Sequence, residues 1–122
     1  MAEHYSSFEY KGTRWFLQRI TAVFLIGVLA FHFMLLHFVN HAAEVTFLGT
    51  QARMQQVGYF GTMIAFLVTA TFHGVNGVYN ALVNQGLSGT RRSTVKWVLV
   101  VASGVLILQG VRTSLYMAGI LS

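Results

Sequence analysis

Residues 20–43 read ITAVFLIGVLAFHFMLLHFVNHAA and contain no Asp, Glu, Lys or Arg. A helix of these 24 residues is about 36 Å long at 1.5 Å per residue, which exceeds the ~30 Å hydrocarbon core of a bilayer. The run therefore predicts a first membrane-spanning helix at about residues 15–41. A signal peptide is not expected, because its apolar region would be shorter and followed by a small-residue cleavage site.

Two more apolar stretches follow. Residues 54–90 are uncharged, and we expect a second helix at about 56–83. Gly86, Ser88 and Gly89 then mark a loop.

The third stretch has only 15 residues between Lys96 and Arg112, so its helix spans a membrane only if it continues past Arg112. We predict this helix at 94–118, with Arg112 near the far interface. No linker divides the chain, which indicates one membrane domain over residues 1–122.

The composition excludes an ordinary soluble domain. Charged residues make up 9% of the chain, against about 25% in soluble domains, while 55% are hydrophobic and the mean hydropathy is +0.61. We predict an all-α integral membrane protein with three transmembrane helices and no separate catalytic domain. Because the chain has no cysteine, any redox group must be held by histidine. The net charge of +5 is spread between apolar runs, so a nucleic-acid partner is not expected.

Basic residues predict the orientation, because Lys and Arg are enriched in cytoplasmic flanks. The predicted first loop has only Arg53. The N-terminal flank and the second loop together hold six basic residues: Lys11, Arg14, Arg19, Arg91, Arg92 and Lys96. We predict that the N-terminus and the second loop are cytoplasmic and the C-terminus is outside, in a prokaryotic cytoplasmic membrane or its organellar equivalent.

Four of the five histidines, His32, His37, His41 and His73, lie in or at the ends of the predicted spans. An ionisable side chain is costly in hydrocarbon and normally faces the interior of a bundle. His37 and His41, four residues apart, are expected on one helix face, with His32 about 140° from His37. One face therefore cannot present all three histidines of the first span.

On the second predicted helix, polar side chains recur at three-, four- and seven-residue spacing and predict a stripe that faces protein or a cofactor: Thr62, Thr69, His73, Asn76 and Asn80. Structural alternatives stay open, because Asn and Thr stripes join helices and a single intramembrane histidine also lines proton paths.

Haem suits this inventory of side chains. A low-spin haem needs two axial ligands and an apolar slot, which imidazoles from two helices supply without thiols. Gly77, on the same face as His73, would let a flat macrocycle approach the backbone. Arg19 and Thr21 at the inner end of the first helix, and Arg112 at the outer end of the third, are candidates for interaction with propionates.

The segment LQRITAV at residues 17–23, followed by His73-x-x-x-Gly77, resembles the membrane-anchor subunits of succinate:quinone oxidoreductase, the respiratory complex II and fumarate reductase superfamily. The likeness covers about residues 15–118 and is greatest to the smaller, second anchor. It implies that His73 is an axial haem b ligand and that a partner anchor supplies the second ligand and the other half of the bundle. It also places Arg19 near a propionate or the quinone.

A second likeness concerns residues 36–40, LHFVN, which are similar to the first helix of two-haem anchors, where a histidine ligates the haem farther from the iron–sulfur subunit. By helix rise, His73 lies about 15 Å and His37 about 33 Å from the inner ends of their helices, so two haems would not overlap. Whether the complex holds one haem b or two stays open. Without the second haem, His32 and His37 are packing or proton-path residues.

The sequence departs from the family at the quinone site. Single-haem anchors carry an Asp-Tyr pair eleven and twelve residues after the ligand, and the tyrosine binds a quinone carbonyl. Here these positions are Asn84 and Gln85, and Tyr79 is not an obvious replacement because it lies about 240° around the helix from His73. If a quinone binds at the inner side, another subunit is then a candidate source of the donor.

The resemblance implies an anchor of succinate dehydrogenase, not catalytic on its own. It would bind haem b and quinone and dock the iron–sulfur and flavoprotein subunits that carry electrons from succinate to quinone, linking the tricarboxylic acid cycle to the respiratory chain. Fumarate reductase would use the same architecture in reverse. The alternative is a haem-free helical membrane subunit with a structural or proton-relay role.

Overall fold

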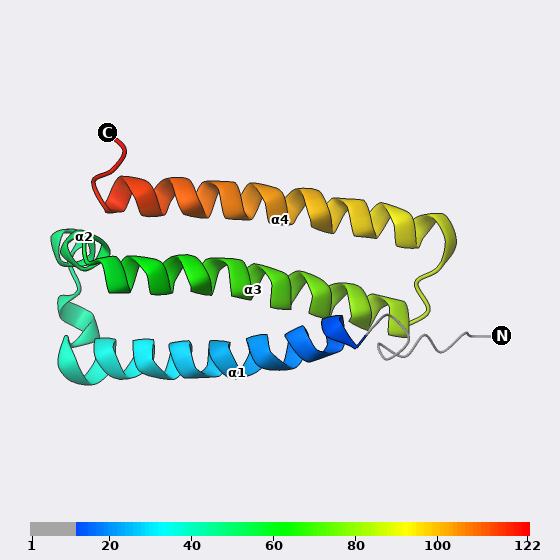
Figure 1. Ribbon diagram of the computed structural model, residues 1–122, viewed down its shortest axis with the longest axis horizontal. Coiled ribbons are helices and arrows are strands. Elements are labelled where there is room, and N and C mark those ends of the chain that lie inside the picture. The colour runs from blue at the N-terminus through cyan, green and yellow to red at the C-terminus, as the bar shows by residue number, and fades with distance from the viewer. Residues whose placement is uncertain (1–11) are drawn as a thin grey trace.

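The computed structural model describes residues 12–122 and forms three long antiparallel helices connected in sequence (Figure 1). The first is α1 (Thr13–Met34), continued by a π-helical turn, η1 (Leu35–Val39). The second and third are α3 (Val57–Asn84) and α4 (Gly89–Met117). The middle helix, α3, lies between α1 and α4 (Figure 1).

All three helices are long and apolar enough to cross a membrane. The spans of 27, 28 and 29 residues correspond to about 40 Å of helix each, which covers the ~30 Å hydrocarbon core and part of both interfaces. The predicted fold class is confirmed: no strand occurs within residues 12–122, and three helices can span a bilayer.

The third helix begins at Gly89, five residues before the predicted start. Residues 89–93 are polar and basic, and hydropathy therefore places them outside the hydrocarbon. A helix does not end where the hydrocarbon ends, however, because its backbone hydrogen bonds also form in the interface. The second connection is short and uses glycines with positive φ at Gly86 (95°) and Gly89 (58°).

The prediction that His37 and His41 share a helix face is wrong, because His41 lies in the first connection and not in the helix. The first helix ends at Val39, and His41 lies beyond it with a φ of 47°, a conformation uncommon for a residue with a side chain. A 3₁₀ turn, η2 (Ala42–Glu44), follows. The chain then forms α2 (Phe47–Met54), an unpredicted short helix capped by a hydrogen bond from Gly49 N–H to Thr46 Oγ1 (3.1 Å).

Apolar side chains mostly face outward. Within the described residues, Met54 is the one buried hydrophobic side chain, whereas large apolar residues along all three long helices are exposed. This distribution suits lipid and protein neighbours in a membrane. Where α3 and α4 meet, a Cβ built on Gly110 would lie 2.6 Å from Leu67 Cδ2, so the glycine permits close approach.

Candidate functional site

The contact between Thr21 on α1 and His73 on α3 joins two of the predicted site residues. Thr21 Oγ1 lies 3.0 Å from His73 Nδ1, with both residues half-buried. Thr21 is eight residues from the start of α1 and His73 eleven from the end of α3, so both lie about 12–17 Å from the same end of the bundle. The antiparallel packing of α1 and α3 therefore brings them to one level.

The surrounding hydrogen bonds favour one tautomer of His73. Thr21 Oγ1 lies 2.7 Å from the Leu17 carbonyl and 3.1 Å from that of Gln18. Its single hydrogen is donated to its own helix, which leaves an oxygen lone pair to accept from Nδ1–H of His73. His73 Nε2 is then the unprotonated nitrogen, and it has no hydrogen-bond partner within residues 12–122. An imidazole in this state has a free lone pair on one nitrogen and is oriented by its other nitrogen, which is the arrangement that metal-binding histidines use.

Gln18, which the sequence reasoning did not select, holds the backbone beside His73. Its Nε2 donates to the His73 carbonyl (3.1 Å), and its Oε1 accepts from Asn76 Nδ2 (2.7 Å). Gly77 is close to the same amide: a Cβ built there would lie 3.4 Å from Gln18 Nε2. Gln18 precedes Thr21 by three residues, and this polar i, i+3 pair in an apolar helix was the available sequence signal.

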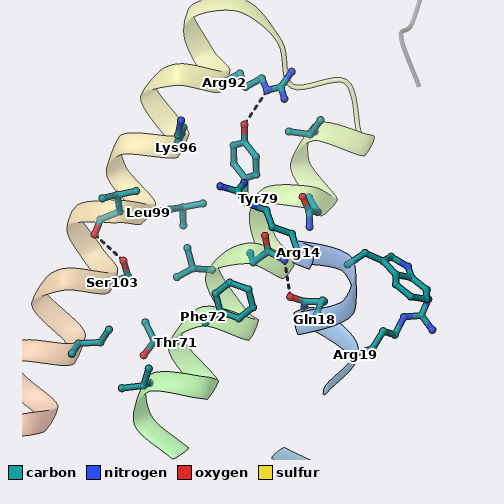
Figure 2. Close-up of a pocket in the computed structure, with 18 residues that line it drawn as sticks. Arg14, Gln18, Arg19, Thr71, Phe72, Tyr79, Arg92, Lys96, Leu99 and Ser103 are labelled. Atoms are coloured by element: carbon teal, nitrogen blue, oxygen red, sulfur yellow. Dashed lines mark hydrogen bonds between the residues drawn. The ribbon is translucent and has the colours of Figure 1, made fainter. Parts of the chain in front are cut away.

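A groove of about 680 Å³ lies between α1, α3 and α4 at the same end (Figure 2). Tyr79 projects into it, and its hydroxyl accepts from Arg92 Nε (3.0 Å) on α4. Arg14 and Lys96 also line it. Arg19 also lines the groove; it lies on the side of α1 away from α4, with its guanidinium 4.6 Å from the Trp15 ring centroid in a cation–π contact (Figure 2). His73 is not among the groove residues.

His37 and Arg112 lie apart from the Thr21–His73 contact. His37 is exposed in the π-helical turn, where its Nδ1 is 3.1 Å from the Phe33 carbonyl and its ring stacks on Phe33 (4.2 Å between centroids). The 16 residues from Thr21 to His37 correspond to about 24 Å of helix. Arg112 is exposed and lies five residues before the end of α4. That end of α4 is at the same end of the bundle as the first connection (Figure 1).

Over residues 2–111 the chain matches the family described as succinate dehydrogenase/fumarate reductase transmembrane subunit. The chain belongs to this family. No curated protein and no solved structure matches it. The resemblance read from residues 17–23 and from His73 and Gly77 is thereby confirmed at the level of the family.

As a succinate dehydrogenase/fumarate reductase transmembrane subunit, the protein is part of a complex with other subunits. The family is one of cytochrome b-type anchors. One feature of the structure fits a haem: the imidazole of His73 has its Nδ1 hydrogen-bonded to Thr21 and its Nε2 without a partner among the described residues. No second histidine lies at the same level in the described chain, because His32 and His37 are 11 and 16 residues beyond Thr21 on the first span. One axial ligand is therefore the most that this subunit offers at that level.

The positions that replace the family's Asp-Tyr pair lie at the end of α3. Asn84 is its last residue, Gln85 follows it, and both are exposed and outside the groove. Tyr79 is the tyrosine that lines the groove, and its contact with Arg92 could not be read from the sequence, because the two residues lie on different helices.

Proposed function

We propose that this subunit is a cytochrome b-type anchor of succinate dehydrogenase and that His73 is an axial ligand of its haem b. The single observation that carries the proposal is the hydrogen bond between Thr21 Oγ1 and His73 Nδ1 at 3.0 Å. This contact would orient the ring and leave Nε2 available to ligate the iron. A histidine used only to join helices would more simply pair both ring nitrogens with protein groups, donating from one and accepting at the other.

The haem, when bound, supplies a one-electron relay in the membrane. The chain holds the ligand in place: Thr21 sets the tautomer, and Gln18 ties the backbone of His73 to α1. Gly77 leaves room for the Gln18 amide, which in turn holds Asn76. The second axial ligand comes from a partner anchor that completes the bundle.

Arg19 would neutralise a propionate from the end of α1, where its side chain already lies against Trp15. At the opposite end, His37 would ligate a second haem, with Arg112 as a cation at the same end of the bundle. Support for this second site is the exposure of His37 and its position on a π-helical turn, a feature frequent at functional sites.

For the quinone, we propose that the decisive hydrogen-bond donor comes from another subunit. Asn84 and Gln85 are directed to the surface at the end of α3, where a docked subunit would cover them. The basic ends of α1 and α4 would face the cytoplasm and receive the iron–sulfur subunit, to which the flavoprotein is joined. Electrons would pass in that order to the haem and the quinone.

The test is the haem content of the purified complex carrying His73→Ala. We expect one b-type haem signal to disappear from the reduced-minus-oxidised spectrum, while the subunit still inserts, since alanine is cheaper than histidine in lipid. His32→Ala is the matched control, because His32 is also a half-buried intramembrane histidine but lies away from Thr21. Full haem content in His73→Ala would contradict the proposal and favour a structural or proton-relay role.

A further inference from the structure

The groove between α1, α3 and α4 combines a basic opening with an apolar wall. At the opening lie Arg14 from α1 and Lys96 from α4, near the Tyr79–Arg92 hydrogen bond. Figure 2 shows these side chains on three different helices around one recess.

The charged side chains at this opening are all positive. Glu44 is the one acidic residue within the described chain, and it lies in the first connection at the opposite end of the bundle. A neutral quinone head group needs hydrogen-bond donors but no set of cations, whereas an anion is attracted by every one of them. The groove therefore favours a negatively charged head group.

The remainder of the groove runs along the membrane span. Phe72 and Val75 on α3 and Leu99 and Ile107 on α4 line it, and the polar side chains of Thr71, Asn76, Asn80 and Ser103 lie between them. From Lys96 to Ile107 is 11 residues, or about 16 Å of helix, which matches the ~15 Å depth of one leaflet of hydrocarbon. The same recess thus offers cations at the level of head groups and apolar side chains at the level of acyl chains.

We propose that this groove is a binding site for one anionic phospholipid of the leaflet at the N-terminal ends of α1 and α4. Arg14, Arg92 and Lys96 contact the phosphate, and the apolar wall holds an acyl chain. Basic recesses between transmembrane helices bind anionic lipid head groups in this manner. The proposal requires that the chain spans a membrane and does not depend on haem ligation by His73.

The experiment measures lipid binding to the delipidated, purified complex by native mass spectrometry, with phosphatidylglycerol as the anionic probe and phosphatidylcholine as the neutral one. We expect one phosphatidylglycerol to bind at least tenfold more tightly than phosphatidylcholine. Lys96→Gln should weaken it about fivefold, the factor typical of one basic residue at an anionic lipid surface, and Arg14→Gln combined with Lys96→Gln about 25-fold. Arg91→Gln is the matched control, because Arg91 is an exposed neighbour of Arg92 that does not line the groove.

A second pair of variants changes the shape of the groove without changing its charge. Val75→Trp fills the groove and should abolish the preferred lipid, whereas Val78→Trp places the same ring at an exposed position outside it and should leave binding unchanged. Millimolar inorganic phosphate should not displace the lipid, because it lacks the acyl chains.

Equal affinity for the two lipids, or equal weakening by Arg91→Gln and Lys96→Gln, would overturn the proposal in favour of diffuse attraction. Displacement by a short-chain quinone would overturn it in favour of a quinone site. The haem spectrum of each sample is recorded in parallel: loss of lipid with an intact spectrum supports the lipid site, and loss of haem in His73→Ala with lipid retained shows that the two proposals are independent.

Discussion

Thr21 on α1 and His73 on α3, 52 residues apart in the chain, are joined by a 3.0 Å contact between the threonine hydroxyl and the ring Nδ1. The hydroxyl also lies within hydrogen-bond distance of two carbonyls of its own helix, which favours donation to that helix and acceptance from the histidine Nδ1–H. The geometry of this pair explains why a threonine follows Arg19 by two residues: it reaches the ring from the facing helix.

Replacing Thr21 tests whether this hydroxyl tunes a haem ligand. Thr21→Val removes the acceptor of Nδ1–H, which makes the imidazole a poorer electron donor and less able to stabilise ferric iron. We expect the midpoint potential of one haem to rise by about 40 mV, the one-electron equivalent of a hydrogen bond worth about 1 kcal/mol. Potentiometric titration of the complex measures this shift.

Thr21→Ser is the matched control, because it keeps the hydroxyl and should keep the potential. A purely structural contact predicts reduced stability in Thr21→Val with the potential unmoved, and that result would remove Thr21 from the haem environment.

Replacing His37 tests the second haem. If His37 is an axial ligand, the wild-type complex holds two haems b and His37→Leu holds one, as counted by pyridine haemochrome against protein. Phe38→Leu is the control, since Phe38 is an exposed neighbour on the same π-helical turn. One haem in the wild-type complex, or two in His37→Leu, would return His37 to a packing role against Phe33.

Gly110 should be required for the close packing of α3 on α4. In Gly110→Ala the new Cβ meets the Leu67 side chain, with Cδ2 at 2.6 Å and Cγ at 3.3 Å, so Leu67 must change its rotamer or the helices must separate. We expect a loss of about 1–3 kcal/mol in the free energy of unfolding, the usual cost of overpacking. Detergent titration followed by circular dichroism measures it.

Gly104→Ala on the same helix is the matched control, because a Cβ at Gly104 meets nothing within 4 Å. This variant should unfold at the wild-type concentration of denaturing detergent or slightly above it, since alanine favours helix by roughly 0.5–1 kcal/mol over glycine. Equal stability of the two variants would show that Leu67 moves without cost.

The orientation is testable by labelling, because the chain has no native cysteine. Ser88→Cys lies in the connection between α3 and α4, and Ala43→Cys lies in the connection at the other end. We expect a membrane-impermeant thiol reagent added outside intact cells to label Ala43→Cys and not Ser88→Cys, as the basic flanks predict. The reverse pattern would invert the orientation.

Crosslinking adds a second readout of the same orientation. A lysine introduced as Arg91→Lys, exposed at the start of α4, should crosslink to the iron–sulfur subunit, with Arg112→Lys as the control at the opposite end. Lys11, which also carries the orientation prediction, lies outside the described residues.

Hydropathy and charge determined the number of spans and the fold class without tertiary information. These properties depend on the cost of placing charges in hydrocarbon, which each segment of sequence expresses locally. Hydropathy could not predict where the third helix begins, because the polar residues 89–93 continue the helix in the interface. The separation of His37 from His41 likewise depended on where η1 ends and on the backbone angle at His41.

Sequence alone also selected Thr21 on the first helix and His73 and Gly77 on the second, but it specified no contact between the two helices. Only the tertiary structure decided that Thr21 faces the ring of His73, that Gln18 occupies the space beside Gly77, and that Tyr79 meets Arg92 at the opening of a groove. The physical reason is that helix periodicity fixes which side chains share a face, whereas the relative rotation and level of two packed helices are set by their whole contact surface.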